Sequence, residues 1–323
     1  MTTKHLLLLG LTSLSLLLAA CGDDGDASTT TGPGGIGAGG NDTGVGGGGT
    51  GGGGGSGYTL TKIDGTFATP ESCYWNAQQQ VWYVSNVAPM SEDLTQPDGV
   101  GWISRIGSDG VVMDEQWVTG LDTPAGMRML NGTLWVSNIN EVVGIDTETG
   151  AVVDTASIPG ATLLNDPAED GESIYVTDTF GNAIYSFTPP DLSTGVTVTS
   201  MQLQGPNGLL FDGGRLYIAS LADFDPATMG PFLTFDLNTK DIAPFGALTG
   251  KLDGLEKDGE DFLVSDFSTA RIFRVKPDGS FETAYDLKAE GLVTIADHGI
   301  DPASGTLCIP DLQGNAVFLL RRD

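Results

Sequence analysis

Basic side chains are scarce in this sequence. Its 323 residues include 14 Lys and Arg against 42 Asp and Glu, which gives a formal net charge of −28. No basic stripe is available to neutralise phosphates, and this argues against nucleic acid as a partner. The same deficit argues against electrostatic binding to anionic lipid headgroups. An acidic rim would instead attract cations.

The sequence also lacks helical periodicity and contains few histidines. No segment sustains a helical period, which favours an all-β chain. The sequence has 2 His, and one of them, His5, lies in an N-terminal apolar segment. The other, His298, has no Gly-x-Ser-x-Gly motif to accompany it, which argues against a Ser-His-Asp hydrolase.

The N-terminal apolar run covers residues 6–18, which is too short for a membrane-spanning helix. It is followed by Leu18–Cys21 (LAAC), which resembles a bacterial lipobox. We predict that residues 1–20 are a lipoprotein signal peptide and that Cys21 is lipidated. The alternative is an ordinary signal peptide followed by a stray cysteine. Lipidation would place the protein in the cell envelope outside the cytoplasm, with acyl chains as its sole membrane contact.

Residues 21–57 contain the predicted lipidated cysteine and a tract of Gly, Thr, Asp and Ser with almost no apolar side chains. Such a tract cannot bury enough surface to offset its ordering entropy, so we predict a flexible tether. Its glycines do not form a phosphate-binding loop, because no strand precedes them and no Lys-Ser or Lys-Thr follows.

The rest of the chain, residues 58–323, is built from a repeat. Gly205–Ser220 (GPNGLLFDGGRLYIAS) reads as a strand, a tight turn and a second strand, and related segments recur about every forty to fifty residues. Six copies predict a six-bladed β-propeller with four strands per blade. The copies lie at residues 70–86, 124–138, 164–178, 205–220, 252–266 and 296–311.

The ends of the repeat predict how the ring closes. The last copy supplies three strands, and Tyr58–Ile63 alternates like a strand ahead of the first copy. We therefore expect Tyr58–Ile63 to be the outer strand of the last blade, which removes a free sheet edge. Cys73 and Cys308 lie in the first and last blades. They either form a disulfide, which an exported protein permits, or remain two buried thiols.

Two connections between second and third strands are long, at residues 87–100 and 221–231. Both are predicted on the face where the innermost strands begin, as candidate lids. Five second strands end in a polar residue on this same face: Asn86, Asn138, Asp178, Asp266 and Asp311. We predict that these side chains are solvated. The alternatives are that they line a substrate funnel or bind a second cation. The five tryptophans are predicted to pack mostly between blades.

One position at the start of each innermost strand should point into the central tunnel. Across the six repeats this position holds Glu71, Ala125, Asn165, Asn207, Asp253 and Ala296. Two carboxylates and two amide oxygens form the ligand set that Ca²⁺ prefers. The alternative is a polar tunnel that holds water and no metal.

This set resembles the senescence marker protein (regucalcin)/gluconolactonase family of six-bladed propellers, which includes luciferin-regenerating-enzyme-like proteins. The resemblance implies that Glu71, Asn207 and Asp253 bind a divalent metal. It implies that Asn165, followed by Asp166, contacts metal-bound water or substrate. The expected ion is Ca²⁺, with Zn²⁺, Mn²⁺ or Mg²⁺ as alternatives.

The resemblance also implies a hydrolase of a small lactone or ester, with Asp253 as general base and Asn165 orienting the substrate. Asp166 and His298 are the further candidate substrate contacts. Sugar lactonases carry an Arg where this chain has Leu163, so sugar lactones are doubtful substrates. The competing hypothesis is a non-catalytic surface binding propeller, similar to NHL-type propellers, with a structural ion. Nothing in the sequence indicates an oligomer.

Overall fold

The protein is described by a computed structural model of residues 57–88 and 93–323. Residues 58–323 form one compact unit. The predicted signal peptide, Cys21 and nearly all of the predicted tether lie outside the described residues. Among the described residues, no helix combines the length and apolar character that crossing a membrane requires.

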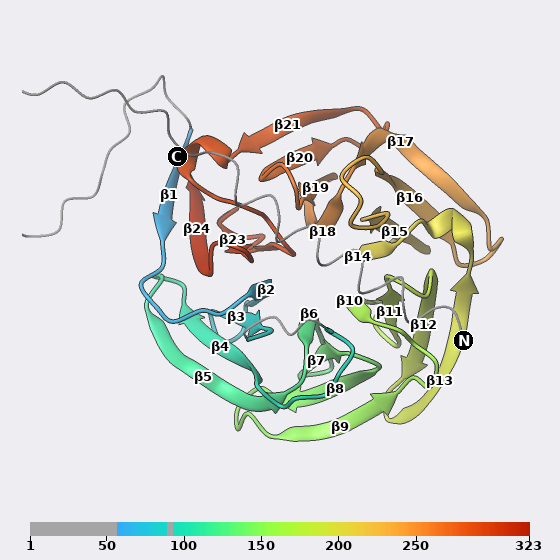
Figure 1. Cartoon of the computed structure of the whole chain (residues 1–323), viewed down its shortest axis with the longest axis horizontal. Coiled ribbons are helices and arrows are strands. Elements are labelled where there is room, and N and C mark those ends of the chain that lie inside the picture. The colour runs from blue at the N-terminus through green and yellow to red at the C-terminus, as the bar shows by residue number, and fades with distance from the viewer. Residues whose placement is uncertain (1–56, 89–92) are drawn as a thin grey trace, which may run out of the picture. The chain divides into compact units, whose positions relative to one another are not determined.

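Six four-stranded antiparallel sheets stand around a central axis, as predicted (Figure 1). Blade 1 comprises β2 (Pro70–Asn76), β3 (Val81–Asn86), β4 (Gly101–Gly107) and β5 (Val112–Leu121). Blade 2 comprises β6 (Pro124–Leu130), β7 (Thr133–Asn138), β8 (Glu141–Asp146) and β9 (Val152–Ser157). Blade 3 comprises β10 (Leu164–Glu169), β11 (Ile174–Asp178), β12 (Ala183–Thr188) and β13 (Asp191–Thr199). In each blade the first strand is nearest the axis and the fourth lies at the periphery.

Blades 4 to 6 repeat this arrangement. Blade 4 comprises β14 (Pro206–Asp212), β15 (Arg215–Ser220), β16 (Gly230–Asp236) and β17 (Ile242–Gly250). Blade 5 comprises β18 (Leu252–Asp258), β19 (Asp261–Asp266), β20 (Arg271–Val275) and β21 (Phe281–Asp286). Blade 6 comprises β22 (Gly299–Ile300), β23 (Leu307–Asp311), β24 (Ala316–Arg322) and, as its outer strand, β1 (Tyr58–Lys62). Two short 3₁₀ turns, η1 (Met201–Leu203) and η2 (Lys288–Glu290), connect strands.

The ring closes through β1, which confirms the predicted outer strand of blade 6. β1 pairs antiparallel with β24, and Tyr58 lies opposite Arg322. Blade 6 therefore contains strands from both ends of the described chain. This pairing covers the edge of β24 that would otherwise be open to other strands.

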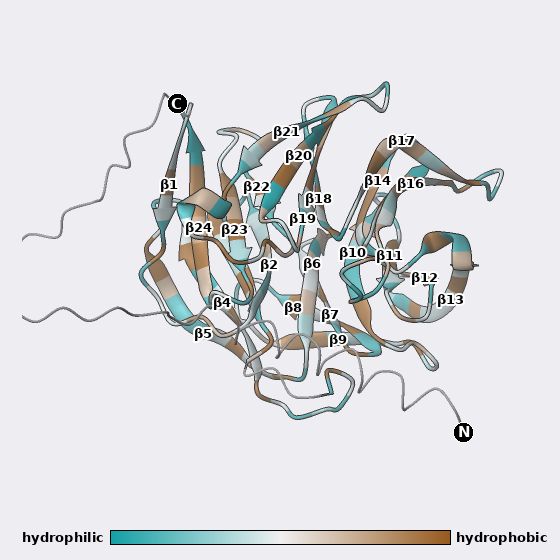
Figure 2. Cartoon of the chain, turned by 45° about the horizontal axis from the view of Figure 1, so that its top comes forward, coloured by the Kyte–Doolittle hydropathy of each residue, from teal (hydrophilic) through white to brown (hydrophobic). Residues whose placement is uncertain are grey.

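Apolar side chains are concentrated between neighbouring blades rather than in one central core. Each of six clusters joins two adjacent blades, and the first unites Tyr83 and Ile103 of blade 1 with Met127 and Val136 of blade 2. Hydrophilic and hydrophobic residues alternate within the strands (Figure 2). Successive side chains of a strand point to opposite faces of its sheet, so Tyr83 of β3 packs against blade 2 while Trp82 packs against blade 6.

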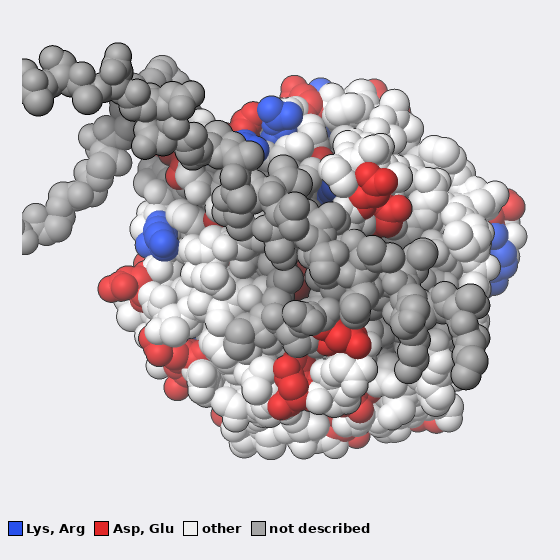
Figure 3. All heavy atoms as spheres, in the orientation of Figure 1, with Lys and Arg blue, Asp and Glu red and all other residues white. Residues whose placement is uncertain are grey.

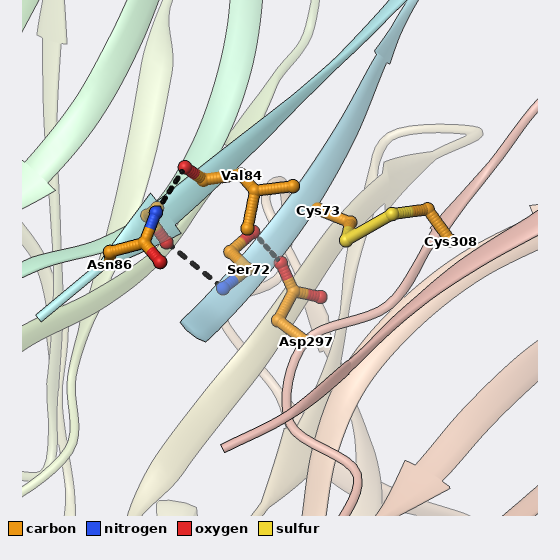
Figure 4. Close-up of a disulfide and its surroundings, with 7 residues drawn as sticks. Ser72, Cys73, Val84, Asn86, Asp297 and Cys308 are labelled. Carbon is orange, nitrogen blue, oxygen red and sulfur yellow. Dashed lines mark hydrogen bonds between the residues drawn. A yellow bond between two sulfur atoms is a disulfide. The ribbon is translucent and has the colours of Figure 1, made fainter. Parts of the chain in front are cut away.

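A disulfide joins the first and last blades. Cys73 on β2 and Cys308 on β23 are bonded, with their Cα atoms 5.8 Å apart (Figure 4). Of the two alternatives that the sequence left open, the structure contains the disulfide. The bond lies within the cluster that packs blade 6 against blade 1, so ring closure is covalent as well as strand-paired.

Candidate functional site

A β-bulge places each candidate ligand at the axis. In blades 1 to 5 the first residue of the innermost strand pairs with the last residue of the second strand, and the register then shifts. In blade 3, for example, Leu164 pairs with Asp178, and pairing resumes at Pro167. The residues between, including Asn165, are released from the ladder. Bulges commonly re-aim side chains next to functional sites in this way.

The structure buries the predicted ligands and brings at least two of them into contact. Glu71, Asn207 and Asp253 are buried, and Asn165 is half-buried. The Asn165 Nδ2 donates to Glu71 Oε1 over 3.4 Å, a contact between blades 1 and 3 that reaches across the ring. Side chains from non-adjacent blades therefore converge at the axis.

Each of the four predicted ligands keeps one buried oxygen without a hydrogen-bond partner. These atoms are Glu71 Oε2, Asn165 Oδ1, Asn207 Oδ1 and Asp253 Oδ1. A buried polar atom without a partner is costly, so its recurrence in four matched side chains calls for an explanation. A hard divalent cation would satisfy all four, because carboxylate and amide oxygens are its preferred ligands.

Charge repulsion within the ring points in the same direction. Burial and the neighbouring charge of Asp253 raise the pKa of Glu71 well above its usual range. Burial and the charge of Asp297 do the same to the pKa of Asp253. A bound cation would reverse both effects. Within residues 57–88 and 93–323, no three His, Cys, Asp or Glu side chains are grouped so as to hold a metal, so an ion here would depend on the two asparagine oxygens as well.

A second layer of acidic side chains lies one residue after the ring positions, at Asp166 on β10 and at Asp297 ahead of β22. Asp166 Oδ2 accepts from the Leu209 backbone N–H over 2.7 Å, and Asp297 Oδ2 accepts from Ser72 Oγ over 2.5 Å (Figure 4). The Oδ1 atoms of both aspartates are buried and have no hydrogen-bond partner. Burial raises the pKa of Asp297 to about 7, and burial together with the charge of Asp297 raises that of Asp166.

Two glycines make room for this second layer. A Cβ on Gly126 would lie 2.5 Å from Asp166 Oδ1, and one on Gly254 would lie 2.8 Å from Asp297 Oδ1. Neither position can carry a side chain without moving the aspartate. In the Leu-Asp-Gly sequence of Leu252–Gly254, Asp253 is thus the predicted ring ligand, and Gly254 leaves space for Asp297 of the neighbouring blade.

His298 follows Asp297 and is fully buried. Neither ring nitrogen has a hydrogen-bond partner, and burial lowers the pKa of His298 to about 3, so the imidazole is neutral at physiological pH. Its predicted role as a substrate contact, like that of Asp166, stays a prediction.

A partly buried ion pair, which sequence reasoning missed, lies deeper in the tunnel. Arg128 of blade 2 and Glu256 of blade 5 approach to 3.3 Å from opposite sides of the ring. The Arg128 Nε also donates to the Pro167 carbonyl over 3.1 Å, and its guanidinium lies 5.4 Å from the Tyr74 ring centroid. Both charged residues lie three positions after a ring position. That shared spacing is the sequence signal that could have revealed them.

The prediction that the strand-end polar residues are solvated was wrong. All five are buried, with exposed fractions of 4% or less. Asp178 accepts from the backbone N–H groups of Thr162 and Leu163, and Asp311 accepts from those of Val293 and Thr294. These side chains fix the segments that lead into the innermost strands, because otherwise unpaired amides need an acceptor.

One of the two predicted lids is anchored beside the ring. The buried Lys251 lies two residues before Asp253, and its Nζ donates to the Asp225 carbonyl over 2.6 Å and to Thr228 Oγ1 over 3.0 Å. Both partners belong to the connection 221–231. The other connection includes residues 89–92, which lie outside the described residues, and Leu94 at its far side accepts from Thr123 Oγ1 over 2.9 Å.

Comparison with known proteins shows that this chain resembles several solved structures in fold. No protein-family model matches the sequence, and no curated protein matches it. Among solved structures, a gluconolactonase from Xanthomonas campestris is 16% identical with a TM-score of 0.59, covering 82% of this chain and 89% of that one. A luciferin-regenerating enzyme is 12% identical with a TM-score of 0.57, covering 82% and 95%. A nutrient-binding protein from Bacteroides ovatus is 13% identical with a TM-score of 0.59, covering 82% and 77%.

These likenesses confirm the six-bladed propeller and the resemblance in fold to gluconolactonase and luciferin-regenerating enzyme. At such identities they do not carry an activity to this chain. The argument for function therefore depends on the tunnel residues.

Proposed function

We propose that this protein is a divalent-metal-dependent hydrolase of a small lactone or ester. The four buried, unpartnered oxygens of Glu71, Asn165, Asn207 and Asp253 support the proposal, because carboxylate and amide oxygens are the ligands that a hard cation prefers. Ca²⁺ is the expected ion. When bound, a divalent cation would polarise the substrate carbonyl and acidify a water molecule.

The protein side chains supply the remaining steps. Asp253 acts as the general base, because its carboxylate lies at the ring and would be ionised beside a cation. Asn165 orients the substrate through its amide oxygen, which has no hydrogen-bond partner among the described residues. Asp166 lies directly behind it and holds the backbone of blade 4 in place.

Leu163 favours a different class of function. The resemblance implies an Arg at this position in sugar lactonases, and here an apolar side chain is buried while its backbone N–H is bonded to Asp178. The alternative proposal is a non-catalytic binding propeller whose ring holds a structural ion. In either case, the proposed location is the bacterial cell envelope, through a lipid on Cys21.

A substrate panel with one matched variant tests the proposal. We expect the purified protein to contain stoichiometric divalent metal and to hydrolyse at least one lactone or aryl ester. Asp253→Asn should lower kcat/KM by at least 100-fold, on the order of a general-base contribution. Asp114→Asn, which changes a partly exposed carboxylate on β5, serves as the control. Bound metal without turnover across the panel would favour the binding propeller.

A further inference from the structure

A second pocket lies between the first and last blades, away from the ring. Its volume is about 370 Å³, and its lining comprises Trp75, Trp82, Ser108, Asp301, Ser304, Thr306, Arg321 and Arg322. Trp75 is four residues along β2 from Glu71, which places it about 13 Å further down the strand. The pocket therefore opens at the hairpin end of the blades, opposite the end where the ring residues lie. Its volume falls in the lower range of small-molecule sites.

One wall of the pocket is aromatic. The rings of Trp75 and Trp82 lie with their centroids 4.7 Å apart, and Trp82 is almost fully buried. Trp75 is half-buried and packs on the cluster that joins blades 6 and 1. An indole held from behind and open in front offers a rigid flat surface for a ligand at low entropic cost.

Arg321 supplies a cation that no carboxylate of residues 57–88 and 93–323 neutralises. All seven arginines lie in the described part of the chain, and six of them have a carboxylate within 4.0 Å; among the described residues, none lies that close to Arg321. It donates one hydrogen bond, to the Ser108 carbonyl over 3.2 Å. A guanidinium has five N–H donors. In a chain with 42 acidic residues, a pocket arginine without an acidic partner is available for an anionic ligand.

The other polar groups of the pocket are held in place by neighbours. Arg322 is neutralised by Asp258 at 2.8 Å and donates to the Tyr285 hydroxyl over 3.0 Å. Asp301 accepts from Ser304 Oγ over 2.6 Å within its own turn. Ser304 Oγ also contacts Thr306 Oγ1 at 2.9 Å. The turn therefore presents carboxylate and hydroxyl oxygens to the pocket. Among the described residues that line the pocket, Arg321 is the cation that has no acidic partner.

We propose that this pocket binds a sugar acid, a pyranose ring bearing a carboxylate. The apolar C–H face of the ring would stack on Trp75, the carboxylate would pair with Arg321, and ring hydroxyls would bond to Asp301, Ser304 and Thr306. Bidentate pairing of guanidinium with carboxylate provides the charge selectivity. A neutral sugar lacks that pair, and a planar aromatic acid lacks the hydroxyls. The proposal is independent of the ring and of its metal.

Calorimetric titration of the full-length protein with three probes tests this assignment. We expect D-glucuronate or D-galacturonate to bind at least tenfold more tightly than D-glucose and at least tenfold more tightly than benzoate. Arg321→Gln and Trp75→Leu should each weaken uronate binding at least tenfold. Arg215→Gln, which alters an exposed arginine on blade 4, should leave it unchanged.

Three outcomes would overturn the proposal. They are the absence of uronate binding at millimolar concentration, benzoate binding as tightly as uronate, and unchanged affinity in Arg321→Gln. Thermal unfolding of each variant verifies that the propeller is intact. Titrations repeated with a chelator and with Asp253→Asn should give the same affinity, and a loss there would instead place the uronate at the ring.

Discussion

Acidic residues serve two opposite purposes in this protein. Many on the surface build turns: Asp146 accepts from the backbone N–H groups of Glu148 and Thr149, and Asp236 and Asp278 do the same in other hairpins. Hydrogen bonds from Thr149 lower the pKa of Asp146. Acidic side chains also dot the molecular surface (Figure 3). Those in the tunnel have raised pKa values instead, because burial and mutual repulsion disfavour their charge.

Asp297 should make the metal-free protein less stable as pH rises. Its pKa is about 7 in the folded protein and roughly 3.9 in an unfolded chain. The folded state therefore holds a proton that the unfolded state has lost between these values, and stability falls from about pH 4 to about pH 7. Asp297→Asn removes this penalty, which is on the order of 4 kcal/mol at pH 8.

Urea unfolding of wild type and Asp297→Asn at pH 4.5, 6 and 8, with chelator present, measures the difference. His298 has the opposite sign, since its pKa is lowered and it costs stability as pH falls from about 6.5 to about 3. That contribution is common to both proteins and cancels. A stability difference that does not grow with pH would contradict the assignment.

The Arg128–Glu256 pair is predicted to be costly to break and cheap to replace. Removing one partner of a fully buried pair costs roughly 3–5 kcal/mol, whereas an apolar pair of similar volume is often neutral. The Arg128 and Glu256 side chains remain 14% and 12% exposed, which places this pair toward the lower end of that range. We expect Glu256→Gln to cost about 3 kcal/mol, near the lower end of that range, because Asp166 and Asp297 still stabilise the charge of Arg128. Chemical unfolding should show Arg128→Met/Glu256→Leu closer to wild type. Equal destabilisation of both variants would contradict this.

Sequence reasoning reached some tunnel residues and not others, for a physical reason. The ring residues recur at one position of a repeat, so aligning the six copies identifies Glu71, Asn165, Asn207 and Asp253. The Arg128–Glu256 pair also shares one repeat position, three residues after Ala125 and Asp253, but that these two residues meet depends on two blades facing each other across the tunnel. Strand-end residues such as Asp178 looked exposed because hydrophilic character does not reveal a buried backbone partner.

At the level of elements, the strand pattern was predictable because each strand is a short apolar run bounded by turn residues. Segments such as Ile174–Asp178 and Tyr58–Lys62 therefore match their predicted places closely. The bulges that aim the ring side chains were not predicted, since a register shift leaves no mark in the hydrophobic pattern. The disulfide remained open because strand assignment alone could not place two sulfur atoms within bonding reach.

Loss of the disulfide should weaken ring closure. Cys73 and Cys308 are 235 residues apart in sequence, so the bond restricts the unfolded chain over a long loop. We expect Cys308→Ala to lower the free energy of unfolding by roughly 2–5 kcal/mol, with the six-bladed fold retained through β1 and β24. Urea unfolding of the oxidised protein, the reduced protein and the variant measures this. A reduced protein as stable as the oxidised one would contradict it.

For the whole molecule, a cation in the ring should couple to global stability. At a Ca²⁺ concentration one hundred times its Kd, binding adds about 2.7 kcal/mol, equivalent to a Tm increase of roughly 5–10 °C in a domain of this size. Glu71→Gln should abolish most of this increase. In the presence of chelator, the same variant should be more stable than wild type, because one repelling buried carboxylate is gone.

Differential scanning calorimetry with Ca²⁺ and with chelator separates these effects. Asp114→Asn is the matched control and should respond to Ca²⁺ like wild type. A Tm that is the same in Ca²⁺ and chelator would remove the metal from the proposal. Substitution of Ca²⁺ by Mg²⁺, Mn²⁺ or Zn²⁺ in the same scans would rank the ions.

The pairing of β1 with β24 also makes the domain suited to circular permutation, in which the chain begins and ends at a different point of the same fold. Tyr58 and Arg322 face each other across that pair, at a Cα separation of about 5 Å. A short linker could therefore join residues 58 and 322, and new termini could open at the exposed residues 276–278 of the hairpin between β20 and β21. Such a circular permutant would encode the same six sheets with β24 and β1 as an ordinary hairpin, so the Cys73–Cys308 bond would no longer be needed to hold the ring shut.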